Sequence, residues 1–221
     1  MTNTIKYGVI GTGVMGQEHI QNINIIENAE VVAICDTNEN SRNQTKSLVK
    51  DSTKFYNDLN ELISNNIADA YIIATPNFTH INVLEHILKT NKHLLIEKPL
   101  CTTTEDCKKF EILSKNYSKI IWTGMEYRYM PPVKQLIKEV HNNVIGKIKM
   151  FSIREHRFPF LHKVDDWNRF AINTGGTLVE KCCHFFDLMR LVTQSEPIKV
   201  YASGDQDVNH LLETYDGKTP D

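Results

Sequence analysis

Apolar runs alternate with amphipathic stretches through the first half of the chain, and this alternation restricts the fold more than any other feature. The strand-like runs lie at 5–10, 30–35, 68–74, 92–97 and 118–124. The helix-like stretches between them lie at 14–27, 38–50, 58–65, 79–90 and 103–116. Strands that are apolar throughout and separated by helices are typical of a parallel sheet covered on both faces. The sequence therefore predicts a doubly wound α/β domain over residues 1–124.

The pattern changes after Gly124. Two prolines open a helix-like stretch at 129–140, and a second helix is indicated at 177–193. Between and after them, 146–158 and 198–204 read as strands. Two strands and two helices cannot close a sheet around a core of their own. We therefore expect residues 125–221 to form a partial α+β domain.

Composition favours a small-molecule partner. Lys and Arg number 25 against 27 Asp and Glu, giving a net charge of −2, and the lack of a basic block argues against nucleic acid and membrane partners. The sequence shows neither a signal-peptide pattern nor an apolar stretch of ~20 residues, so we expect a cytoplasmic protein. The five cysteines form no CxxC pair or zinc-binding pattern. We predict reduced thiols and no metal site.

Three glycines follow the first strand in the order of a dinucleotide-binding loop. The segment "GVIGTGVMG" contains Gly11, Gly13 and Gly16, with Val14 and Met15 at the start of the next helix. The first glycine would allow the tight turn, the second the close approach of a pyrophosphate, and the third the packing of helix on strand. The phosphates would lie at the positive end of the helix. This order predicts a Rossmann cofactor site.

Asp36 follows the second strand, about 20 residues after Gly16, where an acid accepts hydrogen bonds from ribose hydroxyls. Its carboxylate would repel a 2′-phosphate, so we predict NAD in preference to NADP. Arg42, one turn into the following helix, keeps NADP open. The alternative role for Asp36 is to cap the helix at 38–50.

A helix-like segment, "TLVEKCCHFFDL" at 177–188, combines apolar residues with ionisable ones. At helical spacing Glu180, His184 and Asp187 share one stripe. Such a stripe either lines a polar cavity or forms an ion-pair network between domains. The periodicity alone leaves both open.

The chain resembles the glucose–fructose oxidoreductase and inositol dehydrogenase family of Rossmann oxidoreductases. The resemblance rests on ordered motifs from residue 5 to about 188. These are Thr75-Pro76, His80, Lys92-His93, Glu97-Lys98-Pro99, Arg128, Gly146, and Gly175-Gly176-x-Leu178-x-Glu180-x-x-x-His184-x-x-Asp187. The resemblance implies oxidation or reduction, linked to NAD or NADP, at a hydroxyl-bearing carbon of a sugar, inositol or related polyol.

The resemblance also implies roles for individual residues. His184 would exchange the hydroxyl proton as hydride moves to or from the nicotinamide, with Glu180 beside it, although relatives commonly have Asp at that position. Lys98, at the carboxyl end of the strand at 92–97, would hold the substrate hydroxyl and stabilise the developing alkoxide.

Further binding residues are expected on the same basis. Thr75, Pro76, His80, Glu97 and Lys98 would contribute to the cofactor site. Arg128, Trp167, Lys181, His184 and Asp187, together with Lys98, would contact the substrate. Lys181 would either pair with Glu180 or add a second cation.

Relatives in this family continue beyond the point where this chain ends, with strands that complete an open, mainly antiparallel sheet used in subunit association. We therefore expect an incomplete version of that sheet, and a homo-oligomer for the full-length relative. Two alternatives to a working dehydrogenase follow: a dinucleotide-binding regulatory protein without turnover, and an inactive truncated fragment. Retention of both Lys98 and His184 argues against the regulatory role, because a sensor needs no proton-transfer group.

Overall fold

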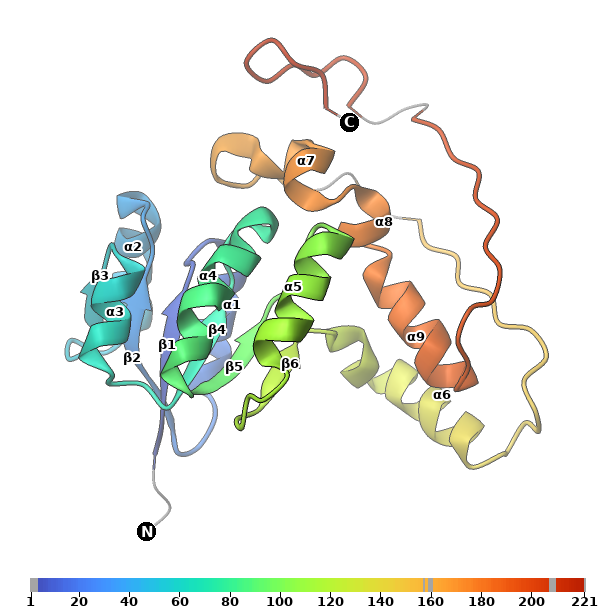
Figure 1. Ribbon diagram of the computed structural model, residues 1–221, viewed down its shortest axis with the longest axis horizontal. Coiled ribbons are helices and arrows are strands. Elements are labelled where there is room, and N and C mark those ends of the chain that lie inside the picture. Colours follow the sequence, from blue (N-terminus) through green and yellow to red (C-terminus); the bar gives the residue numbers. More distant parts are fainter. Residues whose placement is uncertain (1–3, 157, 159–160, 207–209, 221) are drawn as a thin grey trace.

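The protein is described from a computed structural model, which defines residues 4–156, 158, 161–206 and 210–220 (Figure 1). Six strands form one sheet in the order β3-β2-β1-β4-β5-β6, and every neighbouring pair is parallel. The strands are β1 (Ile5–Ile10), β2 (Ala29–Cys35), β3 (Lys54–Tyr56), β4 (Ala70–Ile73), β5 (His93–Ile96) and β6 (Ile121–Thr123). The predicted doubly wound parallel sheet is confirmed, and β3, which the prediction lacked, forms one edge.

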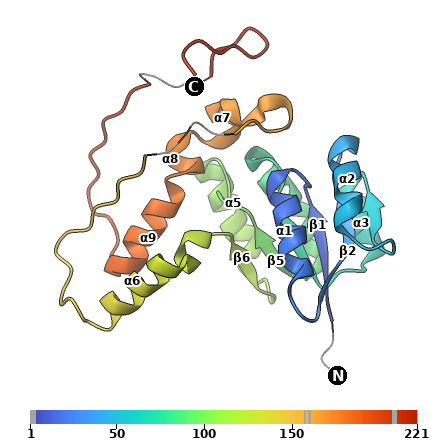
Figure 2. The same ribbon diagram turned by 180° about the vertical axis from the view of Figure 1, so that it is seen from behind.

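Helices cover both faces of this sheet (Figures 1 and 2). They are α1 (Val14–Asn24), α2 (Glu39–Thr45), α3 (Leu59–Asn65), α4 (His80–Ile87) and α5 (Thr104–Ser114), with short 3-10 turns η1 (Lys46–Leu48), η2 (Asn77–Thr79) and η3 (Leu88–Thr90). Helix α1 buries Ile20 and Ile23 on one face, and α4 buries Leu84 and Ile87 on the other. Since neighbouring strand residues point to opposite faces, each strand supplies both cores. Each fully buried aliphatic side chain contributes about 1.5–3 kcal/mol.

Residues at the helix ends satisfy the backbone groups that the helices leave free. Thr103 caps α5 by accepting a hydrogen bond from the Asp106 amide at 3.1 Å. Asn91 takes the left-handed conformation, with φ of 52°, directly after η3. At α2, however, the cap is Asn38, whose side chain accepts from the Ser41 amide at 3.0 Å. The alternative role of Asp36 as that cap is therefore wrong.

The second half packs as helices. After η4 (Glu126–Tyr129) come α6 (Pro131–His141), η5 (Val164–Arg169), α7 (Ala171–Thr174), α8 (Thr177–Glu180) and α9 (Cys183–Thr193). Helices α6 and α9 lie against each other, and His141 Nε2 lies 3.0 Å from the Leu191 carbonyl oxygen. Among the helices of the described residues, none has the length and apolar character needed to cross a membrane.

The strands predicted at 146–158 and 198–204 are not formed among the described residues, and no antiparallel sheet is present there beyond a single bridge between Tyr215 and Lys218. The described residues of these segments, 146–156, 158 and 198–204, run outside α6 and α9 (Figure 1). Met150 is 88% exposed and Ile198 is fully exposed. An alternating pattern indicates a strand only where a neighbour completes the hydrogen-bond ladder, and the described residues supply none. The predicted open antiparallel sheet is therefore wrong for this structure.

Candidate active site

The glycine loop joins β1 to α1 at the carboxyl edge of the sheet. Gly11 has φ of +85°, and a Cβ there would lie 2.6 Å from backbone atoms of Ala74 and Thr75. At Gly16 a Cβ would lie 2.0 Å from the Gly11 carbonyl oxygen. These two glycines let the turn and the helix approach so closely, because any other residue carries a Cβ that the backbone excludes.

Gly13 differs from these two glycines. It is the N-cap of α1, and no heavy atom of the described residues lies within 4 Å of the Cβ position, apart from its chain neighbours and its own helix. The side chain of Val14 is likewise exposed. Backbone N–H groups at the start of α1, beside an open approach, fit the pyrophosphate of a dinucleotide. The described residues therefore suit NAD at this position, where Val14 and Met15 would contribute main-chain groups.

Asp36 lies beside this loop at the end of β2. Its carboxylate accepts hydrogen bonds from the Thr12 amide at 2.6 Å, the Thr12 hydroxyl at 3.0 Å and the Asn38 amide at 2.8 Å. Arg42 donates to the backbone carbonyl of Asp36. These contacts fix the carboxylate next to the glycines, where it can accept a hydrogen bond from a ribose hydroxyl. Arg42 is held beside Asp36 through its contact with the backbone carbonyl.

His80 ties together the loops that follow β4 and β5. Its ring is fully buried, with Nδ1 2.9 Å from the Pro99 carbonyl oxygen and Nε2 3.0 Å from that of Thr75. Burial lowers the pKa of His80 below its usual value despite these carbonyls. The neighbouring Thr75 hydroxyl accepts from Thr79 at 2.8 Å, next to Pro76. His80 can therefore support the predicted cofactor loop only through these backbone contacts.

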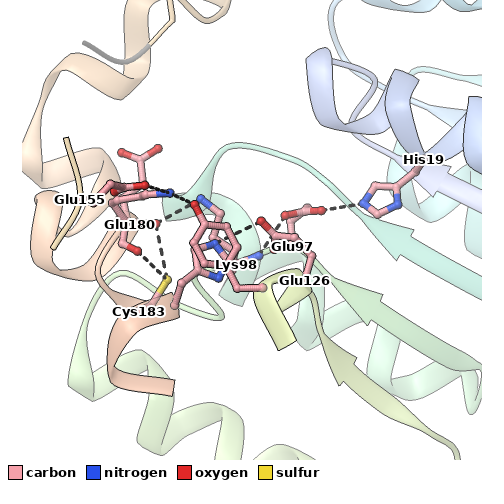
Figure 3. Close-up of polar contacts among 10 residues, drawn as sticks. His19, Glu97, Lys98, Glu126, Glu155, Glu180 and Cys183 are labelled. Carbon is pink, nitrogen blue, oxygen red and sulfur yellow. Dashed lines mark hydrogen bonds and ion pairs between the residues drawn. The ribbon is translucent and has the colours of Figure 1, made fainter. Parts of the chain in front are cut away.

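Glu97 is held by a residue that the sequence reasoning did not identify. His19, on α1, places Nε2 2.6 Å from Glu97 Oε1, and the Lys98 amide donates to Oε2 at 3.2 Å (Figure 3). Burial alone would raise the pKa of Glu97, but His19 and Lys98 outweigh it and keep the pKa below its usual value. The Glu97-Lys98-Pro99 segment is thereby anchored to α1, the helix that follows the glycine loop.

Lys98 joins the two halves of the molecule. Its Nζ donates to the backbone carbonyl of Glu180 at 3.1 Å (Figure 3). Gly175, with φ of +81°, permits this approach, since a Cβ there would lie 2.8 Å from the Thr102 carbonyl oxygen. Close backbone contact therefore brings the Lys98 ammonium group to the segment that contains Glu180.

The predicted helix at 177–193 is broken into α8 and α9, with Lys181 and Cys182 between them. Glu180 and His184 consequently belong to different helices, so the single helical stripe is wrong. The break occurs where Lys181 turns inward: its Nζ lies 3.3 Å from Glu155 Oε1 and contacts the Tyr127 hydroxyl. Lys181 is thus paired with Glu155, and its two predicted roles, pairing with Glu180 or adding a second cation for the substrate, stay predictions.

His184 is 1% exposed and lies under Tyr127. The two rings are stacked, with centroids 4.1 Å apart and planes 6° apart. Nε2 lies 3.3 Å from Glu126 Oε1, while Nδ1 has no hydrogen-bond partner among the described residues. Burial, reinforced by Lys98 and Lys181, lowers the pKa of His184 to about 4. The imidazole is thus neutral near pH 7 and can accept a proton.

Of the remaining predicted substrate residues, Asp187 lies within electrostatic range of His184, and Arg128 is its partner. Arg128 donates from Nε to Asp187 Oδ2 at 2.6 Å, so these two side chains bind each other. Trp167 packs edge-on against Phe78 at 6.3 Å.

Lys163, which the sequence reasoning missed, lies within electrostatic range of Lys98 and Glu180. Burial lowers the pKa of Lys163, and Lys98 adds to this while Glu180 opposes it. Glu126, Tyr127 and Glu155 were missed as well. For the first two, the only sequence signal was their position beside Arg128.

Comparison with known proteins gives consistent matches. The profile described as "Oxidoreductase family, NAD-binding Rossmann fold" (GFO_IDH_MocA) matches residues 5–125, and that of the family's C-terminal alpha/beta domain matches residues 137–216. Among the described residues, no group of metal-ligating side chains could hold an ion.

Individual relatives match over most of this chain. A myo-inositol 2-dehydrogenase from Thermotoga maritima is 30% identical over 90% of this chain and 58% of its own length. An inositol 2-dehydrogenase/D-chiro-inositol 3-dehydrogenase from Halalkalibacterium halodurans is 30% identical over 95% of this chain and 58% of its own. The crystal structure of a probable dehydrogenase from Thermotoga maritima has 30% identity and a TM-score of 0.73, covering 87% of this chain and 56% of that one. The chain thus spans a little under three fifths of the length of these relatives.

Proposed function

The chain belongs to the GFO_IDH_MocA family of NAD-binding Rossmann oxidoreductases, and from this premise we propose that it transfers hydride between NAD and a hydroxyl-bearing carbon of an inositol or related polyol. The observation that carries the proposal is the contact between Lys98 and the backbone of Glu180, which brings an ammonium group to the segment holding His184. The two 30%-identical relatives named as inositol dehydrogenases support the substrate class.

The proposed chemistry follows from these two side chains. NAD, held by the glycine loop and Asp36, would supply the hydride acceptor. Neutral His184 accepts the proton of the substrate hydroxyl, and Lys98 stabilises the negative charge that develops on the oxygen. The exposed carboxylate of Glu126, 3.3 Å from His184 Nε2, offers the proton a route to solvent. In the reverse direction, protonated His184 returns the proton to the carbonyl oxygen.

Charge pairing around the centre favours a neutral substrate. Arg128 pairs with Asp187, Lys181 with Glu155, and Glu97 with His19. These pairs leave Lys98 to hold a hydroxyl oxygen, and Glu126 can accept from further hydroxyls. Asp36 favours NAD over NADP, because its carboxylate would lie near a 2′-phosphate.

The proposal is tested in two stages. Fluorescence titration with NADH and NADPH measures cofactor affinity, and the absorbance of reduced nicotinamide then follows turnover with NAD⁺ and myo-inositol, D-chiro-inositol or glucose. Lys98→Met and His184→Asn should each lower kcat by about 10²–10⁴-fold while leaving NADH affinity within a few fold. Lys108→Met and His86→Asn, at exposed positions on α5 and α4, are the matched controls and should retain activity. NADH binding without turnover on any polyol would contradict the dehydrogenase and support a non-catalytic dinucleotide-binding protein.

A further inference from the structure

Lys181 is a buried cation that faces an aromatic ring. Its side chain is 7% exposed, its Nζ donates to the Tyr127 hydroxyl, and it lies 4.5 Å from the centroid of that ring. Glu155 Oε1, 3.3 Å away, balances the charge on the other side. A buried ammonium with these two partners holds a defined position.

Tyr127 links this cation to the proposed proton acceptor. Its ring lies parallel to the His184 imidazole, 4.1 Å between centroids, and Phe185 packs against it at 6.4 Å. A stacked ring restricts rotation of the imidazole about its side-chain torsions. Lys181, Tyr127 and His184 therefore form one continuous set of contacts. Tyr127 precedes α6 in the sequence, and the other two residues follow it.

Several charged or titratable groups face His184 from the surrounding elements. They are Lys98 and Glu97 at the end of β5, Glu126 and Tyr127 on η4, Lys181 before α9, and Asp187 on α9. Of the two cations, Lys98 is committed to the substrate in the proposed reaction. Lys181 instead contacts Tyr127 and Glu155.

We propose that Lys181 is a positioning residue, which acts through Tyr127 to fix the plane of the His184 imidazole and places a positive charge beside it. This role differs from the direct substrate contact predicted from the sequence, and it rests on the proposed function of His184 as proton acceptor. A cation close to an imidazole disfavours its protonation. Together with burial of the ring, this charge keeps the His184 imidazole neutral near pH 7, and the neutral form is the one that accepts a proton.

The test measures the titration of His184 directly, without turnover. Heteronuclear NMR of imidazole signals in the whole chain, assigned with His184→Asn, follows the ring as pH is lowered in the absence of substrate. Wild-type His184 should remain neutral to near pH 4, in line with its lowered pKa. Lys181→Met should raise the pKa of His184 by on the order of one pH unit. An unchanged titration in Lys181→Met would overturn the proposal.

Three further variants separate charge from structural damage. Lys181→Met with Glu155→Gln removes the carboxylate left without its partner, and should still raise the pKa of His184. Lys181→Arg keeps the charge and a donor for Tyr127, and should restore the wild-type titration. Tyr127→Phe keeps the stacked ring but removes the hydroxyl, and should shift the titration less than Lys181→Met. A Lys181→Arg variant that titrates like Lys181→Met would refute the role of the charge.

Kinetics distinguish positioning from substrate contact. In a chain that turns over, Lys181→Met should move the acidic limb of the kcat profile to higher pH, with a smaller effect on KM. A raised KM with an unchanged pH profile would instead assign Lys181 to the substrate. Because the NMR titration needs no activity, failure of the proposed dehydrogenase reaction would leave the positioning test intact.

Discussion

Two glycines of the same loop should respond in opposite ways to the same substitution. At Gly16 an alanine Cβ would lie 2.0 Å from the Gly11 carbonyl oxygen, whereas ordinary contact begins at 3.4 Å. Helix α1 would have to move away from β1 by more than about 1 Å, disturbing the packing of Ile20 and Ile23. The gain in helix propensity is only about 1 kcal/mol. We expect Gly16→Ala to lower the free energy of unfolding by roughly 2 kcal/mol net.

Gly13→Ala should instead leave the fold intact. Its φ of −64° and ψ of −163° are open to alanine, and its Cβ position is free of contact among the described residues. The lower entropy of the unfolded chain would stabilise the protein by about 0.4–1 kcal/mol, but alanine is a poorer N-cap than glycine, so the free energy of unfolding should change little. The added methyl would occupy the approach of the pyrophosphate, so NADH affinity should fall at least about tenfold, or ~1.4 kcal/mol.

Urea denaturation followed by circular dichroism gives the stability of each variant, and NADH fluorescence titration gives its affinity. Gly204→Ala is the matched control, since its Cβ position is also free and Gly204 belongs to the segment that follows α9, outside the glycine loop. It should change neither quantity. If Gly13→Ala bound NADH as tightly as the wild type, or if Gly16→Ala were as stable as the wild type, the geometric account of the loop would be refuted.

Two further predictions concern the second half of the site. Because the pKa of His184 is about 4 in the folded protein and near 6.5 in the unfolded chain, the unfolded state binds more protons between these values. Stability should therefore fall by about 2 kcal/mol from pH 7 to pH 5 through His184 alone. Urea denaturation at both pH values should show this loss reduced in His184→Asn; equal losses would contradict the lowered pKa. Arg128→Met leaves Asp187, 13% exposed, without its partner, and should cost about 1–2 kcal/mol. A double-mutant cycle with Asp187→Asn should show coupling between the two positions, whereas additive effects would refute the pairing.

The sequence predicted the elements whose causes are local. The tight turn at Gly11 depends on the conformational limits of one residue and its neighbours. The apolar strands and intervening helices followed from periodicity in the same way. Strand β3 was not predicted, because its three residues, Lys54–Tyr56, are too few to show a periodic pattern.

Where tertiary contacts compete with local pattern, the prediction was wrong. The apolar pattern over 177–193 is continuous, yet Lys181 turns inward to Tyr127 and Glu155 and the helix breaks. The alternating segments at 146–158 and 198–204 have strand-like patterns, but a ladder forms only where a second strand is adjacent. Local propensity is worth less than about 1 kcal/mol per residue, so a few buried contacts override it.

The sequence by itself determined the chemistry available to this protein: a dinucleotide loop at Gly11, Gly13 and Gly16, a lysine after a buried strand, and a histidine in an apolar segment. Only the tertiary structure decided the partners of these groups. Lys98 meets the Glu180 carbonyl across 82 positions of sequence, and Lys181 meets Tyr127 across 54. Such pairings depend on how helices dock on the sheet and on one another, which no local spacing encodes. Burial and neighbouring charge, fixed by that docking, then set the protonation state of His184.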